Sequence, residues 1–202
     1  MPPLISTDRR ALLGLAAAGL LSACDRSPAS GFAGIDLSGA AYARDFELQD
    51  VSGQTRRLGD YRGKVLAVFF GFTQCPDVCP TTMGELKLVK EELGAQGADL
   101  LPIFISVDPE RDTAELLREY AAAFGPDFVA LRGSQAQTEA TAREFKVFFK
   151  KVPNEKGDGY SVDHSAAVYL FDRQGRVRVY VRYGSGAQAL LADVKTLLAE
   201  KA

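Results

Sequence analysis

The stretch KVLAVFFGF (64–72) constrains the fold more than any other segment of the chain. It is an unbroken apolar run of strand length, which is typical of a central strand buried on both faces of a sheet. LLPIFISVD (100–108) has the same character. Each run precedes a segment with helical periodicity, at 81–93 and 112–124. Two buried strands that alternate with helices predict an α/β fold.

The remaining elements refine this prediction. Two short segments within 46–58 flank a turn and predict an N-terminal β-hairpin. Residues 134–149 predict a helix with a short extended tail, whereas the polar stretch 150–163 predicts an exposed loop. A second hairpin is predicted within 165–183, before an amphipathic C-terminal helix. This order is thioredoxin-like, with a central mixed β-sheet flanked by helices.

The first 23 residues have the character of an export signal. A polar segment that ends in two arginines precedes an apolar run too short to span a bilayer. LSAC (21–24) resembles the bacterial lipobox, so we expect a lipoprotein signal peptide over 1–23 and a lipid on Cys24. Residues 24–43 are rich in Ser, Gly and Ala and predict a flexible tether, followed by one folded domain over 44–202.

Lipidation also accounts for the odd number of cysteines. The chain has three, and a lipid on Cys24 leaves Cys75 and Cys79 as a self-contained pair. Asp25 follows the predicted lipid site and resembles a signal for retention at the inner membrane. We therefore expect the domain to be lipid-anchored at the periplasmic face of a bacterial inner membrane.

GFTQCPDVCP (71–80) places Cys75 and Cys79 four residues apart, where the first central strand meets its helix. Thiols about one helical turn apart suit a disulfide, and they equally suit one soft metal ion. Helix N-terminal amides lower the pKa of a thiol and favour the thiolate that either role needs. Thr82 and Glu85 have capping-box spacing at the start of the helix. The pair is a disulfide switch, a metal clamp or two inert buried thiols.

His164, the only histidine, immediately precedes the strand predicted from residue 165. In a thioredoxin-like fold this position faces the start of the cysteine-bearing helix. Two thiolates and one imidazole form a soft three-coordinate set that favours Cu(I), or Cu(II) with an added donor, whereas structural zinc normally takes four protein ligands. Asp163 is a candidate for orienting the imidazole. Met83 lies on the apolar stripe of the helix and predicts core packing.

Three motifs in order resemble the Sco/SenC family of copper-binding assembly proteins for respiratory oxidases. They are KVLAVFFGFTQCPDVCP (64–80), SVDPERDT (106–113) and VDHSAAVYLFD (162–172). The resemblance runs from about Phe46 to the C-terminus and so covers nearly the whole predicted domain. One departure is Gln74, which stands where many relatives have histidine.

The resemblance implies that Cys75, Cys79 and His164 are copper ligands in a thioredoxin-like, membrane-anchored domain. It implies cytochrome c oxidase subunit II or another respiratory oxidase as a partner, together with a periplasmic thiol reductant or other copper carriers. Members are implicated as copper donors, as thiol reductants or as both. Asp108 and Asp112 match the second motif, and helix capping or turn formation accounts for them.

The alternative is an enzyme, either a periplasmic thiol–disulfide oxidoreductase acting on the oxidase cysteines or a peroxidase. The chain lacks the C-x-x-C spacing and the facing proline of thioredoxins, and although Thr73 is near, no arginine can be placed beside the cysteines. A third interpretation is a redox-regulated protein that senses copper or oxidant. Net charge is −2 with scattered Lys and Arg, which argues against nucleic acid as a partner. We predict a metallochaperone whose thiols are reduced before copper binds.

Overall fold

The structure, a computed structural model, describes residues 31–154, 157 and 159–200. The predicted signal peptide (1–23), Cys24 and the first part of the predicted tether lie outside these residues, so export and lipidation stay predictions. Within the described ranges, no helix has both the length and the apolar character that a membrane span requires.

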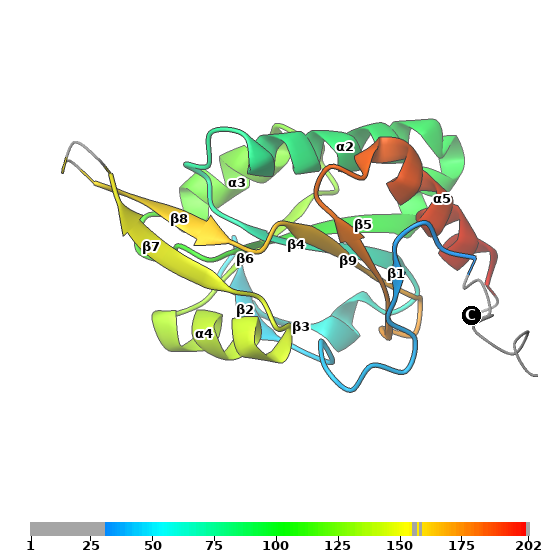
Figure 1. Cartoon of the computed structure of the whole chain (residues 1–202), viewed down its shortest axis with the longest axis horizontal. Coiled ribbons are helices and arrows are strands. Elements are labelled where there is room, and N and C mark those ends of the chain that lie inside the picture. Colours follow the sequence, from blue (N-terminus) through cyan, green and yellow to red (C-terminus); the bar gives the residue numbers. More distant parts are fainter. Residues whose placement is uncertain (1–30, 155–156, 158, 201–202) are drawn as a thin grey trace, which may run out of the picture. The chain divides into compact units, whose positions relative to one another are not determined.

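Eight strands form one mixed sheet in the order β1-β10-β9-β4-β5-β6-β2-β3 (Figure 1). Their bounds are β1 Ile35–Asp36, β2 Glu47–Asp50, β3 Thr55–Arg57, β4 Val65–Gly71, β5 Leu100–Ser106, β6 Val129–Arg132, β9 Ala167–Phe171 and β10 Val177–Arg182. β5 pairs in parallel with β4 and β6, and the other neighbours are antiparallel. β4 is buried at every position, as its continuous apolar run predicts.

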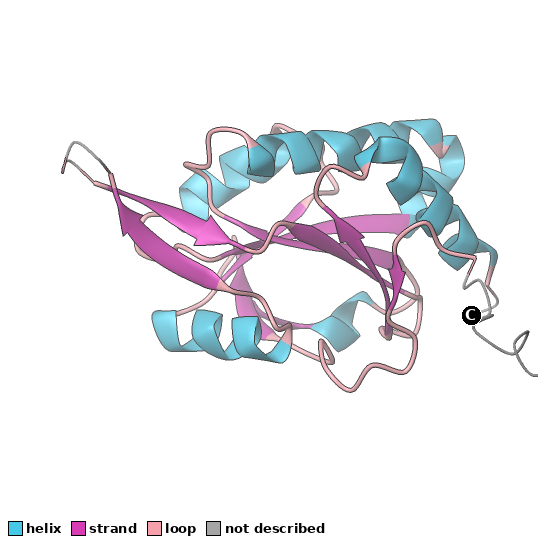
Figure 2. Cartoon of the chain, viewed as in Figure 1, coloured by secondary structure: helices cyan, strands magenta, loops and turns pink. Residues whose placement is uncertain are grey.

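Helices cover both faces of this sheet. Their bounds are α2 Val78–Glu92, α3 Ala114–Ala122, α4 Gln135–Glu144 and α5 Gly186–Ala199, with short 3-10 helices η1 Leu58–Tyr61 and η2 Gly94–Asp99. α2, α3 and α5 lie on one face, and α4 and η1 lie on the other (Figure 1, Figure 2). The predicted thioredoxin-like α/β fold, with its N-terminal hairpin β2–β3, is confirmed.

The parallel pairing of β4 with β5 determines where a site can form. Their register places Gly71 opposite Ser106, so both strands end at the same edge of the sheet. The amide of Val107 donates to the carbonyl of Gly71 at 2.8 Å. The cysteine loop (72–77) therefore lies beside the segment that follows β5 (107–113), at the strand ends where open α/β sheets place their ligands.

Residues 150–163 form most of a second sheet, so the prediction of an exposed loop was wrong. β7 (Phe149–Pro153) pairs antiparallel with β8 (Tyr160–His164), and Phe149 lies opposite His164. This hairpin projects from the body of the domain (Figure 1). Val162 is buried in the core, and Phe149 and Tyr160 pack against it, but charged and polar residues surround these few apolar positions, so the alternation that marks a half-buried strand is weak.

Residues 31–43, predicted as the end of a flexible tether, lie against the domain. β1 pairs with β10, and the amides of Ala33 and Gly34 donate to the carboxylate of Asp193 at 2.5 and 2.9 Å. Asp193 is fully buried in α5, so these bonds satisfy a carboxylate that would otherwise be desolvated without a partner. Phe32, Leu37 and Tyr42 also pack on the core, but three large apolar residues do not form a recognisable pattern in a segment so rich in Ser, Gly and Ala.

Candidate metal centre

The two cysteines lie on either side of a helix start. β4 ends at Gly71 and α2 begins at Val78, which leaves Cys75 in the loop and Cys79 at the second position of the helix. Cys79 is fully buried, whereas Cys75 is half-buried, and both are free thiols. The amide of Cys79 donates to Sγ of Cys75 at 3.4 Å. The first turn of α2 therefore presents a hydrogen-bond donor to the outer sulfur.

The capping box predicted at the helix start does not form. Asp77 is the N-cap residue, without a side-chain cap, and the hydroxyl of Thr82 donates to the carbonyl of Val78 at 2.9 Å. Pro80 falls in the first turn of the helix, where amides have no intrahelical partner and a missing donor costs nothing. The helix can therefore begin before Cys79, which brings this thiol onto its inner face.

The sulfur of Cys79 lies against the last residue of β4. A Cβ atom at Gly71 would come within 2.7 Å of Sγ of Cys79 and within 2.8 Å of the Phe104 ring, so only glycine leaves room for the sulfur. Burial raises the pKa of the Cys79 thiol far above its ordinary value, although a backbone hydrogen bond from Phe72 opposes this shift. Such a thiol keeps its proton until a bound cation replaces it.

His164 completes the site from the end of β8. Its Nε2 lies 3.6 Å from Sγ of Cys79, and its Nδ1 lies 3.1 Å from the carbonyl oxygen of Ser165. Because a carbonyl only accepts, Nδ1 is the donor in this contact, and Nε2 is left free to bind a metal. The rings of Phe69 and Phe72 lie edge-on to the imidazole, at 6.0 and 5.9 Å between centroids.

The protonation state of His164 suits a ligand. Burial lowers the pKa of the imidazole, and the hydrogen bond to Ser165 and the charge of Asp163 offset only part of this effect. The ring is therefore neutral at neutral pH, which is the form that coordinates metals. The ligand atoms of Cys75, Cys79 and His164 all lie within 4.8 Å of one another. Two sulfurs and one imidazole nitrogen at this spacing fit a soft ion such as Cu(I).

Asp163 and Met83 lie near the site but do not contribute donors. Asp163 is exposed and pairs across the hairpin with Lys150, while the ring of His164 is held by Ser165. Successive side chains of a strand point to opposite faces, so Asp163 and His164 diverge, and Asp163 acts on the ring through its charge alone. Met83 is fully buried in the core, as predicted.

The buried Asp112 supports the cysteine loop rather than capping a helix. It accepts hydrogen bonds from the hydroxyls of Thr73 and Ser106, both at 2.6 Å, and from the amide of Thr73 at 3.2 Å. The N-cap of α3 is Thr113, whose side chain accepts from the amide of Leu116. Burial raises the pKa of Asp112 in spite of its hydrogen bonds.

Arg111 is the residue beside the site that sequence reasoning missed. Its Nη1 donates to the side chain of Gln74 at 3.0 Å and to the carbonyl of Tyr160 at 2.8 Å, while its Nε pairs with Asp108. An arginine therefore does stand beside the cysteine loop, contrary to the expectation from sequence. Its partners come from three separate segments, so only its place in SVDPERDT (106–113) could have indicated it.

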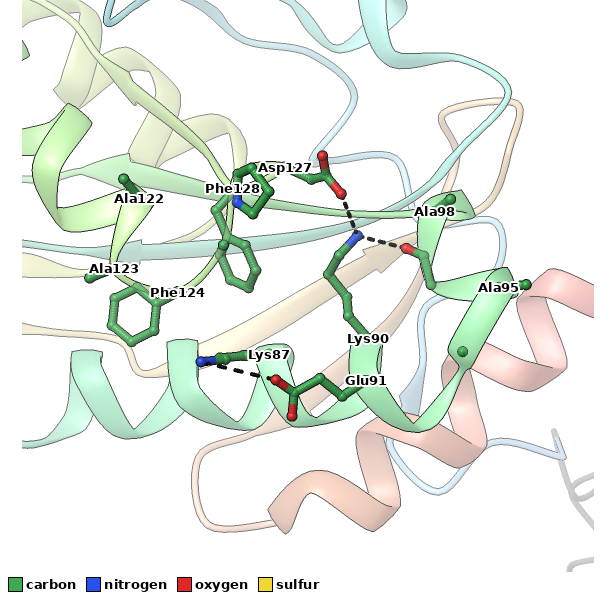
Figure 3. Close-up of a pocket in the computed structure, with 14 residues that line it drawn as sticks. Lys87, Lys90, Glu91, Ala95, Ala98, Ala122, Ala123, Phe124, Asp127 and Phe128 are labelled. Atoms are coloured by element: carbon green, nitrogen blue, oxygen red, sulfur yellow. Dashed lines mark hydrogen bonds and ion pairs between the residues drawn. The ribbon is translucent and has the colours of Figure 1, made fainter.

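A surface groove of about 620 Å³ lies near the C-terminal end of α2, away from the thiols (Figure 3). Lys90 crosses it, donating to the carbonyls of Gly97 and Leu100 at 2.6 Å each and lying 3.8 Å from Asp127. No cysteine or histidine lines this groove. The lysine ties α2 to η2, so the groove has a structural explanation and is separate from the metal centre.

Fold and site together define a thioredoxin-like domain that carries a dithiol–imidazole metal set. Residues 36–199 match the SCO1/SenC family, and the chain belongs to this family. An SCO2-like protein of Rickettsia prowazekii is 41% identical over 132 residues, which are 65% of this chain and 64% of that relative. The chain thus spans just under two thirds of that relative's length.

Solved structures agree with this assignment. ScoI of Arabidopsis thaliana with copper bound superposes with a TM-score of 0.70 and 32% identity, covering 75% of this chain and 94% of that one. Apo Sco1 of Thermus thermophilus gives a TM-score of 0.73 and 37% identity, covering 82% and 96%. The predicted family is confirmed, and copper is bound in a homologous structure.

Proposed function

We propose that the protein is a copper chaperone that carries one copper ion on Cys75, Cys79 and His164 and serves the assembly of the copper centre of cytochrome c oxidase. The observation that carries this proposal is the convergence of the three ligand atoms within 4.8 Å. Copper bound to the related Arabidopsis ScoI supports the choice of metal. The partner is oxidase subunit II or the corresponding subunit of another respiratory oxidase.

The three ligands have different parts in loading. Cys79 is buried and releases its proton only when copper replaces it, so loading is coupled to proton release. His164 is already neutral and contributes Nε2 without losing a proton. Cys75 is half-buried and is the ligand that an incoming thiolate reaches first. Transfer proceeds by exchange of thiolate ligands, and Cu(I) keeps its oxidation state throughout.

The lipid anchor and the periplasmic location belong to the same proposal. They are supported by the lipobox-like LSAC (21–24) and by Asp25 after the lipid site. A periplasmic location explains why a thiol reductant is a further partner, because a disulfide between Cys75 and Cys79 offers no thiolate to copper. Mass spectrometry of the protein from membranes tests this part, since the anchored form begins at a lipidated Cys24.

The test of copper binding compares the reduced protein with His164→Ala and with Ser161→Ala, an exposed control on the same strand. We expect one copper per chain, an affinity that His164→Ala lowers at least tenfold, and no change in Ser161→Ala. Competition with a chelator of known copper affinity measures all three. Equal affinity of the parent and His164→Ala, or no copper in the parent, would falsify the proposal.

One observation favours thiol–disulfide exchange as a second function of the same site. The pair has the asymmetry of a reductase, with Cys75 half-buried, Cys79 buried and the amide of Cys79 donating to the outer sulfur. In that reaction the Cys75 thiolate attacks a substrate disulfide and releases the first substrate thiolate. Cys79 then attacks Cys75 in the mixed disulfide, and its proton passes to the second departing substrate sulfur, so the pair becomes a disulfide as the substrate gains two electrons. His164→Ala separates the functions, because exchange tolerates the change and copper binding does not.

A further inference from the structure

His164 is carried by a hairpin that shares no strand with the main sheet. In the part of the chain that the structure describes, β7 and β8 pair only with each other. The base of the hairpin is held by two hydrogen bonds between Ser165 and Phe148, at 2.9 and 3.0 Å. β8 begins at Tyr160, four residues before His164 and about 13 Å away along the strand. Whatever holds Tyr160 therefore sets the direction of the strand that delivers the imidazole.

Tyr160 has three contacts with the segment that follows β5. Its carbonyl accepts a hydrogen bond from Arg111 at 2.8 Å, and its hydroxyl donates to Asp108 at 2.8 Å. The guanidinium carbon of Arg111 lies 3.7 Å from the centroid of its ring, which is a close cation–π contact. One arginine thus contacts both the backbone and the ring of Tyr160.

The same arginine contacts the cysteine half of the site. Its Nη1 also donates to Gln74, the residue before Cys75, at 3.0 Å. Its guanidinium lies 5.8 Å from the ring of Phe72, and that ring packs edge-on against the imidazole of His164. Arg111 therefore stands between the loop that carries the thiols and the strand that carries the imidazole.

Arg111 is itself held firmly. Its Nε pairs with Asp108, a carboxylate with no exposed surface, and a charge-assisted hydrogen bond of this kind fixes the plane of the guanidinium. Lys151 of the hairpin pairs with Glu110 of this segment, but this ion pair is exposed on both sides. Exposed pairs contribute little, so Lys151 cannot replace the arginine.

We propose that Arg111 is a positioning residue of the metal site, which holds β8 against the cysteine loop so that Nε2 of His164 stays within coordination range of the two sulfurs. The inference rests on the proposed function, since it concerns how the same three ligands are kept together. Without Arg111, β8 keeps the burial of Val162 and the hydrogen bond from Tyr160 to Asp108, but it loses its ties to the cysteine loop, so the imidazole moves away from Cys79.

The experiment is a double-substitution cycle in the full-length protein, with copper affinity as the readout. Arg111→Ala is expected to lower the affinity by about 10- to 100-fold, as loss of groups that orient metal ligands typically does. In a His164→Ala background the same change is expected to have no further effect, because the arginine acts through the imidazole. Arg118→Ala, which removes an exposed arginine bound to the carbonyl of Val51, is the control and is expected to bind like the parent.

Arg111→Lys keeps the charge but loses the planar fork, so it is expected to bind copper as weakly as Arg111→Ala. This conservative variant also serves if the alanine variant does not fold. Parental affinity in the Arg111 variants overturns the inference. So does an equal loss of affinity in the parent and in the His164→Ala background, because that result assigns Arg111 a structural role only.

A readout without copper keeps the inference separate from the proposed function. His164 is the only histidine, so the NMR signals of its ring report its surroundings without overlap from another imidazole. We expect these signals to shift in Arg111→Ala and to stay unchanged in Arg118→Ala. If the parent binds no copper, the proposed function fails, while the ring signals still decide the inference: unchanged signals in Arg111→Ala overturn it.

Discussion

β4 and β8 both lead to ligands of the metal site, but the domain holds them in different ways. β4 is paired on both sides within the eight-stranded sheet and is buried at every position. β8 has one partner, β7, and only Val162 of its five residues is buried. The two cysteines therefore follow a strand of the core, whereas His164 lies on a two-stranded hairpin that projects from the domain.

This difference explains how the three side chains can lie close together in the folded protein while the strand that carries His164 is still able to move. A strand with few buried contacts opens locally at lower free energy than a strand in the middle of the core. Movement of the hairpin changes the position of His164 without moving Cys79, which is fully buried with its sulfur against Gly71. We therefore expect opening at the histidine side to cost less free energy than opening at the cysteine side.

The largest effect is expected for a substitution on the cysteine side. Leu86→Ala empties a fully buried position of α2 and is expected to lower the free energy of unfolding by about 2–5 kcal/mol. Leu88→Ala on the same helix, where the side chain is 51% exposed, is expected to change it by less than about 0.5 kcal/mol. Urea unfolding measures both. Similar losses in the two variants would contradict the view that this helix is built onto the core.

A smaller loss of stability, with a local effect on the site, is expected for a substitution at Gly71, the end of β4 against which Sγ of Cys79 lies. Gly71→Ala forces a methyl group against Sγ of Cys79, so we expect a loss of about 1–3 kcal/mol in stability together with weaker copper binding. Gly84→Ala in α2 meets no atom within 4 Å and is expected to stabilise the helix by about 0.5–1 kcal/mol. Thermal unfolding and copper titration of both variants check this. Unchanged copper affinity in Gly71→Ala would mean that the sulfur is less enclosed than its contacts indicate.

The smallest effect concerns the other exposed hairpin, β2–β3, which unlike β7–β8 is part of the main sheet. Partial burial works against ionisation of Asp50, but hydrogen bonds from Ser52, Arg56 and Gln54 lower its pKa to about 2. The folded pKa lies below the unfolded value of 3.8, so the stabilisation is full above that value and is lost as the pH falls toward 2.

Asp50→Asn is therefore expected to be less stable than the parent by about 1 kcal/mol at pH 6, after allowance for solvent screening, with the difference shrinking toward pH 2. Urea unfolding at several pH values measures it. A difference in unfolding free energy that stays constant with pH would show that packing, rather than the ionised Asp50, holds the turn of β2–β3. Ionisation of Asp50 would then no longer distinguish this hairpin from β7–β8.

The sequence predicted buried elements and the positions of residue types that are rare in the chain. The apolar run of β4 predicted a central strand, and the single histidine before β9 was expected beside the two cysteines, where the structure places it. The hairpin at 150–163 was missed because its few apolar residues, such as Val162, are scattered among charged and polar ones. Arg111 was missed because its role depends on Gln74, Asp108 and Tyr160, which only the folded chain brings together. Short-range patterns do not encode contacts of that kind.

The spacing of the ligands along the chain has a consequence for thermodynamic linkage. Cys75 and Cys79 are four residues apart and stay close in the unfolded chain, whereas His164 is 85 residues from Cys79 and joins them only on folding. A metal that also binds the unfolded state stabilises the folded state by less than its full affinity. We therefore expect copper to raise the melting temperature by less than its affinity for the folded protein alone would give. The increase reflects the part of the binding free energy that depends on His164 and on the folded geometry.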